Sequence, residues 1–311
     1  MNQTTNSVVM IRPVAFRMNE QTAVNNYYQK VLDNLTPASV NAKAQDEFDT
    51  FVQKLKTIGL NVIVVEDTLS PDTPDSIFPN NWISFHENGD VVLYPMFAEN
   101  RRLERREDLL DRLETEGFII NEIMDYTSAE EDAIFLEGTG SIVLDRANGK
   151  AYCALSPRAD EELFIEFCED FEFTPVIFEA FQTVEGARKP IYHTNVILCI
   201  GETFAVICAD CIDDKKERKM VLDSLKGDEK EVILITEDQV NNFAGNMLEV
   251  KGTDDRRFLV MSASAHQSLT KKQVAQLEEH VTIINSSLDT IEACGGGSAR
   301  CMMAEVFLPK E

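Results

Sequence analysis

Hydrophobic residues along this chain recur at two spacings, an alternation typical of strands and a three-to-four-residue spacing typical of helices. Strand-like segments at 81–85 and 91–94 flank the sequence Asn88-Gly89-Asp90, which is a strong hairpin signal. A charged helix is predicted over 101–116, and a third strand is predicted at 118–120. This region therefore reads as strand, turn, strand, helix and strand.

The same order of elements returns three more times along the chain. The predicted strands lie at 141–144, 151–155 and 175–178, at 196–200, 205–209 and 232–235, and at 247–250, 258–262 and 281–284, with helices over 159–171, 215–225 and 270–280. Ahead of these units, the pattern predicts strands at 7–11 and 61–65 and helices over 20–35 and 42–58. A last strand is predicted from Cys301 to Leu308.

The repeated units are evenly spaced. The residues that open them are Asn81, Glu137, His193, Gly245 and Gly297, which are 56, 56, 52 and 52 residues apart. A near-constant period of this length indicates repeated supersecondary units rather than unrelated domains. We therefore predict an α/β fold in which residues 1–311 form a single domain of five ββαβ modules closed around an axis.

Composition is that of a soluble globular protein, with 44% hydrophobic and 27% charged residues. The chain has no run of eighteen apolar residues and no visible secretion signal, so we expect it to be cytoplasmic. Its formal net charge of -25 disfavours nucleic acid and membrane surfaces as partners. The oligomeric state is left open, a homo-oligomer included.

The seven cysteines are an odd number and lie in apolar runs, so we expect reduced thiols rather than disulfides. Cys208 and Cys211 have the C-x-x-C spacing, but no second pair accompanies them, and we expect neither zinc nor redox chemistry there.

His86, His266 and His280 have no place in the repeat, so we expect them at the surface.

Closing five modules around an axis brings the loops that open them to one end, where distant residues can share a pocket. Cys301 follows a loop of three glycines and could be a nucleophile, His193 an acid or base, and Glu137 its partner. Each also has a purely structural interpretation. Cys301 could be a small core residue, His193 a hydrogen-bonded histidine at a strand edge, and Glu137 an ordinary turn acid.

Four motifs together resemble the guanidine-modifying enzymes of the pentein fold, a five-fold pseudosymmetric α/β propeller. They are the segments 75–81, 136–140 and 192–195 and the glycine-rich loop that ends at Cys301. The superfamily includes dimethylarginine dimethylaminohydrolase, arginine deiminase and the amidinotransferases, and the resemblance spans 71–307.

The resemblance implies that Cys301 is the nucleophile, His193 the general acid and base, and Glu137 its acidic partner. It also implies that Arg101 and Arg158 hold the α-carboxylate of an amino-acid substrate. No metal and no organic cofactor are implied. A protonated His193 would favour the Cys301 thiolate, and donors of the glycine loop would stabilise the tetrahedral intermediate.

Two positions depart from the guanidine-binding pattern, because Asn81 and Asn195 stand where relatives place carboxylates. An amide offers donors and an acceptor to a neutral ureido group, whereas a carboxylate suits a guanidinium. The chain is therefore most similar to the citrulline-utilisation hydrolase branch, which implies hydrolysis of citrulline to ornithine, carbon dioxide and ammonia. Asp75, Asn80, Asn81 and Asn195 are the candidate substrate-binding residues of these motifs.

Asp75 is a carboxylate among these candidate substrate-binding residues, so hydrolysis of arginine or methylated arginine remains the alternative. An amidinotransferase and a non-catalytic binder on the same fold are further alternatives.

Overall fold

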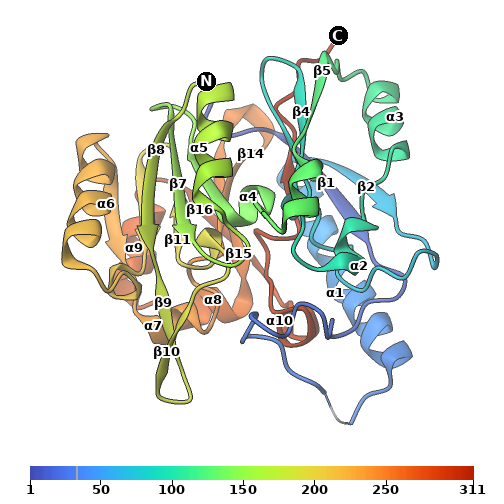
Figure 1. Ribbon diagram of the computed structural model, residues 1–311, viewed down its shortest axis with the longest axis horizontal. Coiled ribbons are helices and arrows are strands. Elements are labelled where there is room, and N and C mark those ends of the chain that lie inside the picture. The colour runs from blue at the N-terminus through green and yellow to red at the C-terminus, as the bar shows by residue number, and fades with distance from the viewer. Residues whose placement is uncertain (33) are drawn as a thin grey trace.

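The repeated pattern folds into small three-stranded sheets, shown in the computed structural model, which describes residues 1–32 and 34–311 (Figure 1). In each sheet the first two strands are antiparallel and the last two are parallel. The sheets consist of β3 (Ile83–Phe85), β4 (Asp90–Leu93) and β5 (Glu122–Asp125); β6 (Ile142–Asp145), β7 (Lys150–Leu155) and β8 (Thr174–Glu179); β11 (Leu198–Ile200), β12 (Phe204–Ile207) and β13 (Glu231–Leu234); and β14 (Leu248–Lys251), β15 (Arg257–Ser262) and β16 (Thr282–Ser286).

The two ends of the chain share the fifth sheet. β17 (Ala304–Glu305) pairs antiparallel with β1 (Ser7–Arg12), and β1 pairs parallel with β2 (Asn61–Glu66). This sheet has the same strand order as the other four, so it completes a fifth module and closes the ring. The first strands of neighbouring modules contact one another, β6 with β11, β11 with β14 and β17 with β3. The five-module α/β fold is confirmed.

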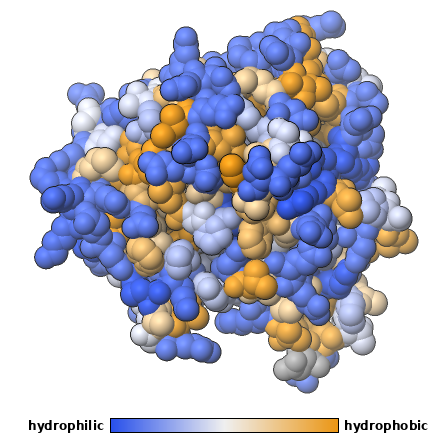
Figure 2. Space-filling view, viewed as in Figure 1, coloured by the Kyte–Doolittle hydropathy of each residue, from blue (hydrophilic) through white to orange (hydrophobic). Residues whose placement is uncertain are grey.

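A helix joins the second and third strands of every module, because parallel strands need a crossover connection. These helices are α1 (Pro37–Thr57), α3 (Asp108–Thr115), α5 (Glu161–Asp170), α6 (Lys215–Gly227) and α9 (Lys271–Glu278). They lie at the periphery of the molecule and bury one apolar face against the sheets (Figure 1). Hydrophilic side chains cover most of the face in Figure 2.

Short elements fill the remaining connections. They are α2 (Glu99–Arg102), α4 (Gly138–Ser141), α7 (Glu237–Val240), α8 (Ala263–Ser268), α10 (Asp289–Gly295) and the hairpin of β9 (Phe181–Val184) and β10 (Ala187–Pro190). Single 3-10 turns at Pro79–Asn81 and Thr194–Val196 lead into β3 and β11. None of the helices in the described part of the chain is long and apolar enough to cross a membrane.

The helix predicted over 20–35 is wrong: its described residues form turns, and residue 33 lies outside the described part. Tertiary polar contacts replace the helical hydrogen bonds there. The Thr22 carbonyl accepts from Arg158, and Asn26 donates to the carbonyls of Gly295 and Gly296. These contacts hold the segment across the end of the ring where the loops that open the modules meet.

Three other element predictions need correction. The helix predicted over 101–116 is split into α2 and α3, because Arg101 and Glu104 both turn inward as a buried ion pair. The strand predicted at 118–120 lies instead at β5, a few residues further along the chain. Phe118 precedes β5 as a buried core residue and forms an isolated bridge to Lys310.

The strand predicted from Cys301 to Leu308 is reduced to β17, so Cys301 lies in a turn that precedes the strand. His86 is also corrected, because it is buried, stacks on Phe171 and lies 2.9 Å from the Ser84 hydroxyl. His266 and His280 are partly exposed.

Candidate active site

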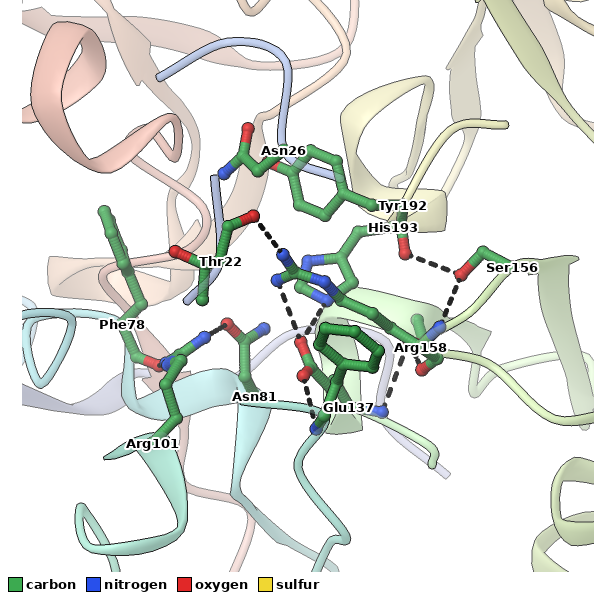
Figure 3. A network of polar contacts seen from close by, with 12 residues as sticks. Thr22, Asn26, Phe78, Asn81, Arg101, Glu137, Ser156, Arg158, Tyr192 and His193 are labelled. Atoms are coloured by element: carbon green, nitrogen blue, oxygen red, sulfur yellow. Dashed lines mark hydrogen bonds and ion pairs between the residues drawn. The ribbon is translucent and has the colours of Figure 1, made fainter. Parts of the chain in front are cut away.

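Four of the five modules contribute side chains to one small cavity at the end of the ring where the opening loops meet. Its lining residues are Thr22, Asn26, Asp75, Phe78, Asn81, Arg101, Arg158, Tyr192, His193, Gly295, Gly297 and Cys301. The close view in Figure 3 shows Arg101 beside Asn81 and Arg158 between Glu137 and Tyr192. The structure thus gathers most of the residues that the motifs singled out.

The carboxylate of Glu137 is fully buried and is held from three sides. Its Oε2 lies 2.7 Å from His193 Nε2 and 3.4 Å from Arg158 Nη1, and its Oε1 accepts the Phe97 amide at 3.0 Å. Because Nε2 is engaged, Nδ1 is the free nitrogen of the His193 ring. A Cβ placed at Gly140 would lie 2.8 Å from this Nδ1, so the absence of a side chain at Gly140 makes room for the imidazole.

The charge states of this pair follow from burial and from their neighbours. Burial opposes ionisation of Glu137, but the charge of Arg158 and the hydrogen bond from His193 outweigh it, and the pKa of Glu137 lies well below its ordinary value. Burial lowers the pKa of His193 to about 4, because the Glu137 carboxylate offsets it only in part. His193 is therefore neutral near pH 7 in the empty site, in contrast to the protonated state that the sequence suggested.

The thiol of Cys301 is contacted by two amide side chains. Asn246 Nδ2 lies 3.2 Å and Asn195 Nδ2 lies 3.7 Å from the sulfur. Asn246 Oδ1 accepts the backbone amide of Arg300 at 3.1 Å, which fixes the orientation of this amide with its NH₂ group toward the sulfur. Two donors therefore point at the position where negative charge would develop on a thiolate.

The glycine loop is required for close packing beside Cys301. Added Cβ atoms would lie 2.7 Å from the Phe78 ring at Gly295 and 2.9 Å from it at Gly297. The loop carbonyls are also occupied, since Tyr192 Oη donates to the Gly296 carbonyl at 2.6 Å and Gln29 donates to that of Gly295 at 3.0 Å. The loop is thus held rigidly against the segment that crosses the site.

The two arginines expected to bind an α-carboxylate both line the cavity, and both are almost fully buried. Arg101 forms a bidentate ion pair with Glu104 at 2.8 and 2.9 Å and donates to Asn81 Oδ1 at 2.7 Å. Arg158 stacks 4.9 Å from the Tyr192 ring and donates to the Thr22 carbonyl at 2.9 Å. Each guanidinium is therefore positioned by protein acceptors before any ligand arrives.

The remaining candidates divide into two groups. Asp75 and Asn81 line the cavity, and each keeps one buried polar atom, Oδ1 and Nδ2 respectively, without a hydrogen-bond partner among the residues described. Asn80 and Asn195 lie behind the lining, where they bond to the Thr139 hydroxyl and the Thr139 carbonyl respectively. Asn80 is thus a supporting residue, and Asn195 faces the sulfur.

Asn246 was missed by the sequence reasoning, although a signal for it existed. Gly245 was recognised as the residue that opens the fourth module, and the side chain that reaches the sulfur belongs to its neighbour. Thr22 and Asn26 were missed because a helix was predicted there. No group of three or more His, Cys, Asp or Glu side chains suited to a metal ion occurs within 1–32 and 34–311.

A family model described as N,N dimethylarginine dimethylhydrolase, eukaryotic, matches residues 12–308. The chain belongs to this family. It is a family of hydrolases, in agreement with a site built from a thiol, an imidazole and a carboxylate. A search of curated proteins found no match.

Solved structures with the same fold are distant in sequence. Apo ArgZ, an arginine dihydrolase from the ornithine-ammonia cycle in cyanobacteria, matches with a TM-score of 0.74 and 16% identity over 98% of this chain and 41% of its own. The chain therefore spans about two fifths of full-length ArgZ. The N-terminal domain of ArgZ bound to product gives 0.69 and 18% identity, with 97% and 99% of the two chains covered.

A dimethylarginine dimethylaminohydrolase variant, crystallised as an adduct with S-methyl-L-thiocitrulline, matches with a TM-score of 0.63 and 13% identity over 96% of this chain and 98% of its own. AgrE has been crystallised with L-arginine and with ornithine and NAD+. At these identities the likeness shows the pentein fold, which agrees with the family assignment.

Replacing Asn246 with alanine should slow turnover more than it weakens substrate binding in this family member. The substitution removes one donor from the developing thiolate, and a hydrogen bond to a charged group contributes about 1.5–3 kcal/mol, so kcat should fall roughly tenfold to a hundredfold. Asn242→Ala is the matched control, because Asn242 is an exposed asparagine four residues away in sequence. An unchanged kcat in Asn246→Ala, with normal folding by circular dichroism, would contradict this role.

The acid limb of the pH dependence of kcat/KM should be centred well below the ordinary pKa range of histidine. A neutral His193 is needed to accept a proton, and its pKa of about 4 keeps it neutral as the pH falls through 6.5. Between pH 6.5 and about pH 4, His193 is protonated in the unfolded chain but neutral in the folded chain, so its contribution lowers the free energy of unfolding as the pH falls. Measured kcat/KM from pH 4 to 8 would test this, and an acid limb centred near 6.5 would refute it.

Proposed function

We propose that this chain is a cysteine hydrolase that acts on the ureido or guanidino carbon of an arginine-related amino acid, with citrulline as the favoured substrate. The orientation of the Asn81 amide is the observation that carries this choice. Its Oδ1 accepts from Arg101 at 2.7 Å, which leaves Nδ2 of this cavity-lining residue as a buried donor without a partner in the part of the chain described. A Cβ at Gly140 would meet this Nδ2 at 2.3 Å and His193 Nδ1 at 2.8 Å, so the donor lies beside the catalytic imidazole.

A ureido group fits this donor better than a guanidinium does. The ureido oxygen accepts hydrogen bonds, whereas a guanidinium offers only donors and would leave Nδ2 facing another N–H group. Leaving a buried donor unsatisfied costs about 1–3 kcal/mol, which is enough to separate the two substrates by one to two orders of magnitude. Asp75 Oδ1 is the complementary unpaired acceptor and suits a substrate N–H.

The proposed reaction uses His193 as the proton carrier. Its free Nδ1 takes the proton of Cys301, and the thiolate, held by the amides of Asn246 and Asn195, attacks the ureido carbon. The carbon–nitrogen bond then breaks as His193 returns the proton to the departing nitrogen. His193 next deprotonates a water molecule that cleaves the carbon–sulfur bond, which regenerates the thiol and releases a carbamic acid. Loss of carbon dioxide from this acid breaks the second carbon–nitrogen bond and frees the remaining nitrogen as an amine. Overall, citrulline and water give ornithine, carbon dioxide and ammonia.

Arginine dihydrolysis is the second candidate, favoured by the unpaired Asp75 oxygen in the cavity. A carboxylate can pair with a guanidinium, and two successive hydrolyses of the guanidino carbon would pass through a ureido group to ornithine. ArgZ, which shares the fold, is named as an arginine dihydrolase, and the family is named for dimethylarginine. Measuring ammonia release from citrulline, arginine, dimethylarginine and agmatine would separate these substrates.

The Asn81→Asp variant should lose citrulline turnover. The aspartate has no donor for the ureido oxygen and would form an ion pair with Arg101 instead, so kcat/KM for citrulline should fall roughly tenfold to a hundredfold. Arginine should bind more tightly to the variant, because a carboxylate can pair with its guanidinium. Steady-state kinetics on both substrates tests this, with the exposed Asn242→Asp as control. A wild-type protein that turns over arginine but leaves citrulline untouched would falsify the ureido assignment.

The nucleophile can be tested separately from the substrate. Cys301→Ala should abolish turnover and leave the fold intact, whereas Cys294→Ala should keep most of the activity. Burial raises the pKa of Cys294, which makes it the less reactive thiol, while Cys301 lines the cavity. Iodoacetamide labelling with peptide mapping provides the readout. Labelling of Cys294 with Cys301 unmodified would contradict the assignment.

A further inference from the structure

A second cavity lies on the axis of the ring, behind the catalytic one. Its walls come from the first strands of four modules, β6, β11, β14 and β17, together with Gln3 near the N-terminus. Its free volume is about 30 Å³, which is room for one or two water molecules or one monatomic ion. Four charged side chains line it: Arg146, Arg300, Glu249 and Glu305.

Arg146 carries a positive charge that forms no ion pair among the described residues. The side chain is 3% exposed, and its guanidinium lies 4.0 Å from the Phe307 ring centroid. Within the described ranges no carboxylate lies in ion-pair distance of it, and its buried Nη1 has no hydrogen-bond acceptor. Burial lowers the pKa of Arg146; the charges of Glu305 and Glu87 oppose this effect from beyond ion-pair distance, and the Arg300 charge adds to it. An isolated buried cation is costly unless a counterion accompanies it.

The other charges of the axial cavity already have partners. Arg300 Nη2 lies 2.6 Å from Glu305 Oε2, and its Nη1 donates to the Met303 carbonyl at 2.9 Å. Glu249 Oε2 accepts the Glu202 amide at 2.6 Å, and its Oε1, which has no hydrogen-bond partner among the residues described, lies 3.7 Å from Arg257 Nε. Neither carboxylate therefore lies in ion-pair distance of Arg146, and its guanidinium keeps a buried N–H donor without an acceptor among the residues described.

We propose that the axial cavity is a binding site for a monatomic anion, chloride in particular, held by the guanidinium of Arg146. The ion would accept N–H donors that have no protein acceptor and would occupy a space too small for an organic anion. Water could fill the same volume but would leave the charge uncompensated. The site lies near the nucleophile, because Arg300, which lines the axial cavity, directly precedes Cys301 in the chain.

Thermal unfolding at constant ionic strength tests the proposal on the full chain. Replacing sodium gluconate with sodium chloride should raise the Tm of the wild type, by about 2 °C for each tenfold increase in chloride above half-saturation. The Arg146→Met variant keeps a long apolar side chain over Phe307 but loses the charge, so its Tm should not respond to chloride. Arg256→Met is the matched control, since Arg256 also lies over a phenylalanine ring but is exposed, and it should respond as the wild type does.

Crystals of the wild type grown in sodium bromide give an independent readout that needs no variant. An anomalous peak beside the Arg146 guanidinium is expected. The proposal is overturned if the cavity shows no such peak, if chloride leaves the wild-type Tm unchanged, or if Arg146→Met responds to chloride as strongly as the wild type.

Discussion

The ionised carboxylate of Glu137 is the interaction on which the rest of the catalytic end depends. A fully buried carboxylate is unfavourable alone, and here His193, Arg158 and the Phe97 amide compensate it together. Two of these partners in turn fix other parts of the site. The bond to His193 leaves one imidazole nitrogen free, and Arg158 in turn fixes the segment that crosses the cavity through the Thr22 carbonyl. Loss of the Glu137 charge would therefore free both the His193 imidazole and the segment that covers the site.

Closure of the ring is the second constraint, because no module holds a complete site. Glu137 belongs to the second module, His193 to the third, Asn246 to the fourth and Cys301 to the segment that leads into β17. These residues meet only when β17 pairs with β1, so the pairing of the two chain ends completes both the fold and the site. The same closure creates the axial cavity, since the inner strands enclose space on the axis that cannot be filled from any one module.

The sequence could predict what depends on periodicity, namely five modules, their crossover helices and the common end at which their opening loops meet. It could not predict what depends on contacts between modules. The 20–35 segment has helical spacing, yet its polar groups bond across the site instead. Arg101 looked like a residue of one long helix, whereas its ion pair with Glu104 turns it inward. Asn246 stands beside the residue that opens the fourth module, but its contact with the sulfur, like the place of Arg146 over Phe307, depends on neighbours distant in the chain.

Charge balance in the catalytic cavity links substrate choice to one carboxyl group. Apart from the imidazole of His193, the thiol of Cys301 and the phenol of Tyr192, the ionisable groups around it are two guanidiniums and three carboxyl groups: Arg101, Arg158, Asp75, Glu104 and Glu137. Glu104 and Glu137 compensate the two arginines, which leaves Asp75 to set the balance. Ionised, Asp75 would match the extra positive charge of a guanidinium; protonated, it would match a neutral ureido group. Burial raises the pKa of Asp75, with Arg101 opposing, and so shifts this group toward its neutral form. The same burial that closes the pocket would thus favour the uncharged substrate that we propose, in the direction that the Asn81 amide also favours.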